Sequence, residues 1–320
     1  MNNRLITLRR AMILAALALV GAAQSARAWS QEADPAAPAE AAVAWYNVQD
    51  WEVEGKGWAD TKRYFDRLPG KAEHSVRAPV WSLSRHSAGM AVRFKTDASQ
   101  IRARYTLLSP NVAMPHMPAT GVSGLDLYAR NQAGQWRWLG VTRPTGQTFE
   151  GELAAGIEPQ LREYMVYLPL YNGVESLEIG VPQRAAFEPL AARGQKPIVF
   201  YGTSILHGAC ASRPGMASPA ILGRRFDRPT INLGFSGNGR MEPEVGQLLA
   251  ELDAAAYVID CLPNMRTKPL CVPNRWCGSC APLAPMPPSC WSKIAHPSDL
   301  GMMRQADVLE PVLRPLLDGR

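Results

Sequence analysis

Long apolar runs and a surplus of charge are what this sequence has little of. Beyond the N-terminus, no stretch approaches the roughly 18 uninterrupted apolar residues of a membrane-spanning helix, so no span is predicted there. The first 28 residues hold four arginines and no acid, which reduces the net charge of +6 to +2 (30 basic against 28 acidic residues) on the remaining 292. Nucleic-acid binding needs a clustered surplus of lysine and arginine. The composition therefore predicts no nucleic-acid partner.

The N-terminus has the three parts of a secretory signal peptide. Three arginines lie among the first ten residues, residues 11–23 are apolar but too short to cross a bilayer, and small residues at 26 and 28 suit a signal peptidase. We expect cleavage before Trp29, which removes residues 1–28 and makes the mature protein periplasmic or secreted. An uncleaved N-terminal anchor is the alternative. Residues 29–44 are rich in Ala, Pro and Glu and are predicted to form a flexible leader.

Residues 45–184 consist of short runs in which apolar and polar positions alternate. Such alternation, repeated about every ten residues, is typical of an antiparallel β-sandwich or jelly roll. The six runs are 90–96, 101–108, 124–130, 136–141, 162–170 and 174–181. We predict an N-terminal β-sandwich domain over this range.

From residue 185 to 320 the pattern changes to alternating buried strands and amphipathic helices. Continuous apolar runs predict strands at 197–202, 230–235 and 255–263, and helical spacing predicts helices at 218–226, 244–253 and 302–317. Strands that alternate with helices form parallel sheets with helices on both faces. The fold class predicted for this half is α/β.

A polar loop follows each of the three predicted parallel strands, and the first two loops contain glycine. They are GTS (202–204), GFSGNG (234–239) and DCLPN (260–264). Ligands of open α/β sheets bind at the carboxyl ends of the strands, so these loops are the candidate site. Ser204 directly follows its strand and would begin a helix; taken alone, such a serine is more often a helix N-cap than a nucleophile.

The order of these loops resembles the SGNH (GDSL-type) hydrolase family. The blocks are GTS (202–204), NLGFSG (232–237), PN (263–264) and HP (296–297), and GLDLY (124–128) is similar to the GxDLY signature of a β-sandwich module that precedes some of these esterases. The resemblance covers nearly all of the predicted mature chain. It implies an SGNH-type (flavodoxin-like) sheet and an exported serine esterase that hydrolyses small O-acyl or acetyl esters, with carbohydrate esters a weaker implication.

The resemblance also implies a role for individual residues. Ser204 is the implied nucleophile and His296 the general base, because a hydroxyl needs an adjacent base to become nucleophilic. The backbone N–H groups of Ser204 and Gly237 and the side chain of Asn264 would form the oxyanion hole. We expect no cofactor and no metal site. The implied partner is a small acyl ester or an acylated carbohydrate.

One region departs from the family pattern. Lys293 occupies the position, three residues before His296, where family members have an Asp, so the third member of the triad is unknown. Residues 261–298 contain no acid, and four cysteines cluster within residues 271–290: Cys271, Cys277, Cys280 and Cys290. The stretch 264–295 is either frameshifted or partly deleted sequence or a disulfide-bearing insertion. Two alternatives to an active esterase therefore stay open: an impaired or pseudo-enzyme form of the fold, and a carbohydrate-binding protein with a vestigial hydrolase domain.

A few other residues are candidates for functional roles. His207 could line the pocket or replace the base, and His116 could reach a substrate, although packing roles are commoner for both. Trp136 and Trp138 share one face of a predicted strand, where core packing is the favoured explanation and sugar stacking the alternative. Cys210 and Cys261 are expected to be small buried residues rather than a disulfide pair.

Overall fold

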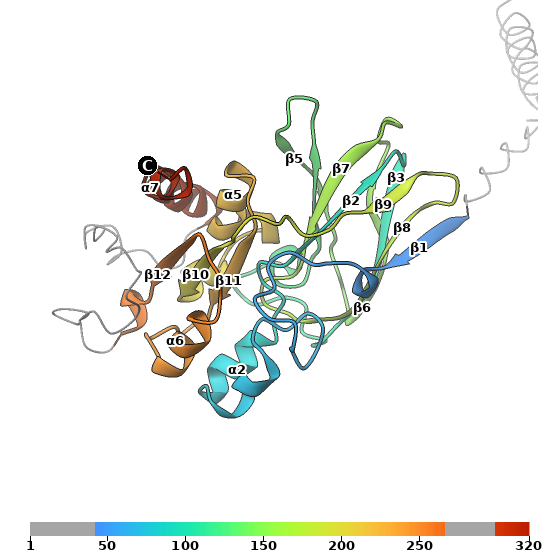
Figure 1. Cartoon of the computed structure of the whole chain (residues 1–320). Coiled ribbons are helices and arrows are strands. Elements are labelled where there is room, and N and C mark those ends of the chain that lie inside the picture. The colour runs from blue at the N-terminus through green and yellow to red at the C-terminus, as the bar shows by residue number, and fades with distance from the viewer. Residues whose placement is uncertain (1–41, 266–297, 320) are drawn as a thin grey trace, which may run out of the picture. The chain divides into compact units, whose positions relative to one another are not determined.

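A computed structural model describes residues 42–265 and 298–319 of the chain (Figure 1). From Val43 on, the described residues belong to one compact unit. The predicted site residues Lys293 and His296 and the four clustered cysteines lie outside the described residues. The boundary between the two predicted domains at residue 184 stays a prediction.

Two antiparallel sheets make up most of the first half of the chain. One has the order β1 (Val43–Asn47), β8 (Val174–Pro182), β3 (Gln100–Leu107), β6 (Thr148–Ala155). The other has the order β5 (Trp136–Val141), β4 (Asp126–Arg130), β7 (Arg162–Tyr167), β2 (Ala91–Thr96), β9 (Phe187–Pro189). Alternate residues of β3 are buried, and Ile101 and Tyr105 share one core with Phe94 of β2 and Val166 of β7. The two sheets therefore bury a common apolar interior.

All six predicted strands of this half are present, and three further strands were not predicted. Strand β1 begins at Val43, inside the range expected to be a flexible leader, because pairing with β8 gives its backbone hydrogen-bond partners. Strand β6 lies at a sheet edge and buries only Leu153 fully, so its sequence lacks clear alternation. Strand β9 has only three residues, too few for a periodic pattern.

The second half contains the predicted parallel sheet, with the strand order β11 (Thr230–Gly234), β10 (Ile198–Gly202), β12 (Ala256–Asp260). All five residues of β10 are buried, as its continuous apolar run predicts. Ile198 and Phe200 pack with α5 (Ser218–Arg225) and α7 (Asp299–Leu317), whereas Val199 and Tyr201 pack with α6 (Pro243–Leu249). Helices therefore cover both faces of this sheet, and the α/β prediction is confirmed (Figure 1).

Part of the N-terminal half packs onto the same parallel sheet. The 3₁₀ helix η2 (Gly70–His74) and helix α2 (Ala78–Ser84) contribute Ala72 and Val80 to the core that contains Val199 and Tyr201. The sequence did not predict these helices, because they are short and lie among prolines and glycines. The remaining short helices are η1 (Val48–Asp50), α3 (Ala119–Val122), α4 (Ser204–His207), η3 (Pro214–Met216) and η4 (Leu262–Asn264).

The outer side of β12 differs from the rest of the sheet. Among residues 42–265 and 298–319, no strand pairs with this edge. Ile259 of β12 is exposed, as are Val308, Val312 and Leu316 at intervals of four residues along α7. None of the helices in these two ranges has the length and hydropathy needed to cross a bilayer.

Candidate active site

The three predicted loops begin side by side at the carboxyl end of the parallel sheet. Gly202, the last residue of β10, is in register with Gly234 of β11 and with Asp260 of β12. The backbone of each neighbouring loop is tied to this end: Phe235 N–H donates to the Gly202 carbonyl (2.8 Å), and Thr203 N–H donates to the Asp260 carbonyl (3.1 Å). The sheet therefore sets the positions at which the loops start.

Ser204 is the first residue of α4 and is 8% exposed. The N-cap of this helix is Thr203, whose hydroxyl accepts from the N–H of Ile205 at 3.4 Å. The alternative that Ser204 merely caps the helix is therefore wrong. The helix is one turn long and ends at Gly208, whose φ of +103° suits only glycine.

Two glycines shape the loop after β11. Gly237 has a φ of +68°, and a Cβ placed there would meet nothing within 4 Å, so its backbone conformation alone requires glycine. Gly239 has a φ of +71°, and its Cβ would lie 2.0 Å from the Gly202 carbonyl oxygen. The loop thus turns tightly at Gly237 and returns against the end of β10.

Asn264 reaches this loop from the other neighbour of β10. It ends η4, directly after β12, and its side-chain Nδ2 donates to the backbone carbonyl of Asn238 at 2.5 Å. The Asn264 amide is therefore held one residue away from Gly237. The structure brings the predicted Ser204, Gly237 and Asn264 to one end of the sheet.

His207 is held in a structural role. Its Nε2 lies 2.7 Å from the Leu170 carbonyl, and its Nδ1 lies 3.4 Å from the N–H of Ser236. Since one partner only accepts and the other only donates, Nε2 carries the proton and Nδ1 is the acceptor. Burial, followed by the nearby Arg67 charge, holds the pKa of His207 well below its usual value. Both nitrogens are occupied, so the role of replacement base is wrong for this histidine.

Arg67 is the site-supporting residue that the sequence did not indicate. It is fully buried, and its guanidinium donates to four backbone carbonyls: Asn232 (3.0 Å), Gly234 (2.8 Å), Leu83 (2.6 Å) and His86 (2.9 Å). Burial lowers the pKa of Arg67 to about 9, which leaves the group charged at neutral pH. Backbone carbonyls are present in every residue, so no sequence motif marks this clamp. It fixes the end of β11 from which the Gly237 loop departs.

Two carboxylates are candidates to support the site: Asp299 is close to His296 in the sequence, and Asp260 lies at the end of β12. Asp299, three residues after His296, accepts from the N–H (2.8 Å) and the hydroxyl (2.5 Å) of Ser212, and so fastens the start of α7. Asp260 ends β12, and burial raises its pKa to about 6. Its Oδ2 is buried and makes no hydrogen bond within the part of the chain that the structure describes. Asp299 is thus committed to a helix start, whereas Asp260 is not.

The residues of GLDLY (124–128) attach the antiparallel sheets to the α/β half. Asp126 is fully buried and accepts from the N–H of Gly215 (2.7 Å) and from Nε1 of Trp138 (2.9 Å). Burial raises the pKa of Asp126 to about 7, against the opposing effects of Gly215 and of Arg213. The Tyr128 ring lies 4.0 Å beneath the Arg224 guanidinium of α5.

The remaining candidates have packing roles or lie at the surface. Trp138 is 48% exposed with Arg213 4.6 Å above its ring, so the expectation that it packs in the core is wrong. Trp136 is half-buried beside Arg130. Cys210 and Cys261 are free thiols. His116 is exposed in a loop that buries Met117 against the segment after α4, and within the described ranges no three His, Cys, Asp or Glu side chains form a metal-type cluster.

Two family models match this architecture. Residues 43–187 match the GxDLY N-terminal module of SGNH hydrolase-type esterases, and residues 195–274 match the GDSL-like lipase/acylhydrolase family. No curated protein matches the chain.

Solved structures are similar to this chain. A protein described as a GDSL-like lipase from Bacteroides ovatus is 38% identical with a TM-score of 0.67; the match covers 70% of this chain and 66% of that one. A salicylyl-acyltransferase from a tetracycline biosynthetic pathway, 18% identical with a TM-score of 0.50, shares the fold over 71% of this chain and 61% of its own. The chain spans just under two thirds of the length of these relatives. It belongs to the GDSL-like (SGNH) lipase/acylhydrolase family, in the group that carries the GxDLY N-terminal module.

Proposed function

We propose that this protein is a serine esterase in which Ser204 is the nucleophile. The observation that carries the proposal is the convergence of three loops at the end of β10: Ser204 begins one, Gly237 turns the second, and Asn264 from the third is bonded beside Gly237. Preorganised N–H donors around a serine are the arrangement that ester cleavage requires.

The proposed reaction has two steps. In the first, Ser204 Oγ attacks the ester carbonyl carbon while His296 accepts the hydroxyl proton, and the oxyanion receives hydrogen bonds from the N–H groups of Ser204 and Gly237 and from Asn264. Collapse of this intermediate breaks the ester C–O bond, and His296 returns the proton to the leaving alcohol. In the second step, water attacks the acyl-enzyme by the same route and releases the carboxylic acid and free Ser204.

The loop geometry assigns the supporting residues distinct tasks. Asn264 carries two N–H groups on its amide; one bonds Asn238, and the second is proposed to reach the substrate oxygen. Arg67 and His207 do not touch substrate in this proposal. They hold the β11 end and the Ser236 N–H, and thereby the direction of the Gly237 N–H.

The setting of the enzyme is also part of the proposal. The two antiparallel sheets form a jelly-roll-like β-sandwich, the N-terminal segment directs export, and small O-acyl groups on carbohydrates are the substrates. The shared core of the two sheets supports the sandwich.

A catalytically weak form of this esterase is the second candidate. Asp299, the nearest acid to His296 in the sequence, is bound to Ser212, and Lys293 stands where a triad Asp is expected. An imidazole without an orienting carboxylate loses about 10⁴ in kcat in serine proteases. This observation favours slow turnover at an intact nucleophile.

The assignment of the nucleophile is tested with a fluorophosphonate probe, which labels activated serines. We expect label on Ser204 in the full chain, and neither label nor p-nitrophenyl acetate turnover in Ser204→Ala. Ser236→Ala is the matched control, since Ser236 lies in the neighbouring loop, donates its backbone N–H to His207, and has a hydroxyl that interacts with Tyr171. Label on another serine, or undiminished turnover in Ser204→Ala, contradicts the proposal.

A further inference from the structure

The outer face of the sheet β1-β8-β3-β6 carries polar side chains in matched rows. Thr106 of β3 is in register with Thr148 of β6 on one side and with Ser176 of β8 on the other, which gives a row of three hydroxyls. The next row has Arg104 of β3 between Glu150 of β6 and Glu178 of β8. Because side chains alternate across a strand, both rows lie on the same face.

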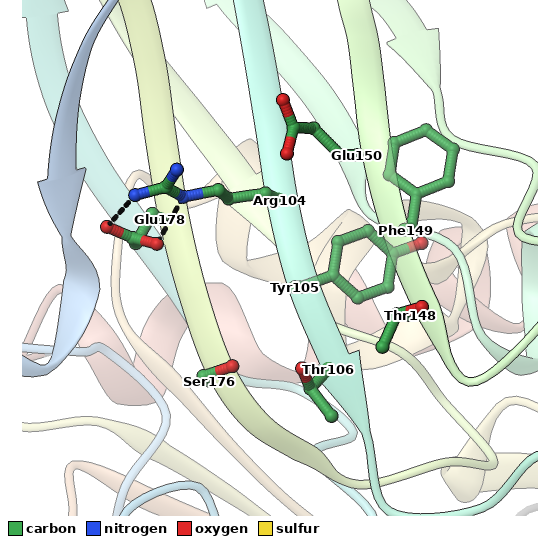
Figure 2. A pocket seen from close by; sticks show the side chains of 8 residues that line it. All are labelled: Arg104, Tyr105, Thr106, Thr148, Phe149, Glu150, Ser176 and Glu178. Atoms are coloured by element: carbon green, nitrogen blue, oxygen red, sulfur yellow. Dashed lines mark hydrogen bonds and ion pairs between the residues drawn. The ribbon is translucent and has the colours of Figure 1, made fainter.

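A hollow of about 300 Å³ lies over these two rows (Figure 2). This volume is at the lower end of the range for small-molecule sites. Tyr105 and Phe149, which lie between the rows along the chain, are in register with each other and stack at 5.2 Å between ring centres, where they pack against the buried core. The floor of the hollow is therefore supported from below.

The charged row is fixed in place before any ligand arrives. Arg104 donates to both oxygens of Glu178, one at 2.8 Å (Figure 2). The Arg104 guanidinium also lies 4.4 Å from the Trp45 ring. Hydrogen bonding from Arg104 lowers the pKa of Glu178, so the pair stays ionised. Trp45 in turn lies over Gly180, where a Cβ would come within 2.7 Å of the indole. Rigid polar groups lose less entropy when a ligand binds.

The chemistry of the hollow selects one class of ligand. The lining holds one arginine and two glutamates: Glu178 is paired with Arg104, and Glu150 lies 4.0 Å from Arg102, which is outside the lining. An anion would meet two carboxylates, and an apolar ligand would leave the ionised row without water. A neutral polyhydroxylated molecule fits, because its hydroxyls both donate and accept, and the hollow offers acceptors, donors and three hydroxyls.

We propose that this face is a glycan-binding subsite for neutral oligosaccharide chains, distinct from the Ser204 site. It would hold a polysaccharide on the enzyme through its hydroxyl groups while a separate part of the molecule carries out the chemistry. Binding here needs no nucleophile and no ester, so it stands or falls independently of the proposed esterase activity.

The test is isothermal titration calorimetry of the full chain with xylohexaose, cellohexaose and mannohexaose, and with tetragalacturonate as an anionic comparison. We expect at least one neutral hexaose to bind, and Thr106→Val/Thr148→Val to weaken that binding about tenfold or more, since two hydrogen-bonding groups are lost at constant volume. The matched control is Thr145→Val, an exposed threonine in the loop between β5 and β6 that does not line the hollow. Ser204→Ala should bind the hexaose as the wild type does. The double variant Thr106→Val/Thr148→Val, called the groove variant below, should hydrolyse p-nitrophenyl acetate at the wild-type rate.

Three results overturn the proposal. They are the absence of binding by every neutral hexaose at millimolar concentration, binding that is equal in the wild type and the folded groove variant, and binding of tetragalacturonate alone. Thermal unfolding of the groove variant establishes that it is folded; should it be unstable, Ser176→Ala removes the third hydroxyl from the opposite strand and is titrated in its place.

Discussion

At the β11 edge of the parallel sheet, residues from the N-terminal half of the chain hydrogen-bond to the strand end and its loop. At the β12 edge, the described residues make no comparable contacts. The end of β11 is clamped by Arg67, and the loop that follows is bonded to His207, which itself rests on Leu170 and Tyr171. On the other side, β12 pairs only with β10 among the described residues, Asp260 keeps a buried oxygen without a hydrogen bond there, and Ile259 is exposed. The start of the Gly237 loop is thus braced by the N-terminal half of the chain. The β12 side lacks comparable support in the described structure.

The strongest way to break this contrast is to remove the clamp. Arg67→Met removes a donor from four backbone carbonyls, of which that of Leu83 keeps the N–H of His86 (3.1 Å). Each buried carbonyl left without a donor costs about 1–3 kcal/mol, a large share of the stability of a typical domain. We expect a large fall in melting temperature, and in the folded fraction a lower kcat with little change in KM.

Arg67→Lys separates charge from geometry. It keeps the positive charge but cannot reach four acceptors with a planar fork. We expect partial recovery of stability and of kcat, measured by calorimetry and p-nitrophenyl acetate hydrolysis. A melting temperature of Arg67→Met within a degree or two of the wild type contradicts the clamp.

The next largest effect is expected at the donor shared by the two sides. Asn264→Ala should lower kcat by about 10²–10³ with a smaller effect on KM, because we propose that its second amide N–H stabilises charge that develops in the transition state. Asn238→Ala is the comparison: it leaves the backbone carbonyl that Asn264 contacts but removes the bond from Asn238 Nδ2 to the Ser236 carbonyl (3.0 Å), so it measures the effect of loosening the loop alone. An unchanged kcat with a raised KM would show that Asn264 only binds substrate.

The attachment of the two halves should depend on pH through Asp126. Its pKa is raised to about 7 by burial, above the value of about 3.8 expected when unfolded, so the folded state binds a proton that the unfolded state releases. Its contribution to the free energy of unfolding therefore falls as pH rises from about 4 to 7, by at most about 1.4 kcal/mol per unit.

Urea unfolding at several pH values across this window measures the effect. Asp126→Asn keeps the size of the side chain and cannot titrate, so the stability of the wild type relative to this variant should decline with rising pH. Parallel pH profiles for the two proteins would show that Asp126 does not titrate in this range.

The smallest effect is expected at the exposed apolar residues of α7, the helix that packs on the parallel sheet. Val308 and Val312 lie one turn apart on the exposed face of α7, and apolar surface of this kind promotes association. Val308→Glu/Val312→Lys replaces them with an ion pair at helical spacing, which suits the helix. Sedimentation should show less self-association than in the wild type or in Arg304→Gln, a change at another exposed position of α7; equal sedimentation of all three contradicts the expectation.

The sequence predicted the strands that show a periodic pattern and the loops that match the order of the family's motifs. Alternation located β2, β3 and β4, and the apolar run at 197–202 located β10, because burial on one or both faces of a strand imposes a period. The loops that bear Ser204, Gly237 and Asn264 were found from block order. Arg67 and the helices at 70–84 could not be found, since a buried cation that bonds backbone carbonyls places no demand on its partners' side chains. Trp138 was misplaced because alternation shows which residues share a face and not whether that face is covered.

The most direct test of the contrast between the two edges compares the rates at which the wild type and Lys293→Asp hydrolyse p-nitrophenyl acetate. We predict that the wild type is acylated at Ser204, seen by mass spectrometry, but turns over p-nitrophenyl acetate slowly, and that Lys293→Asp raises kcat by orders of magnitude through an oriented His296. Lys293→Gln is the control, since it removes the cation without supplying a carboxylate. Wild-type turnover at ordinary enzymatic rates of about 1–10³ per second, with no gain in Lys293→Asp, would contradict the account and show that another carboxylate orients the base.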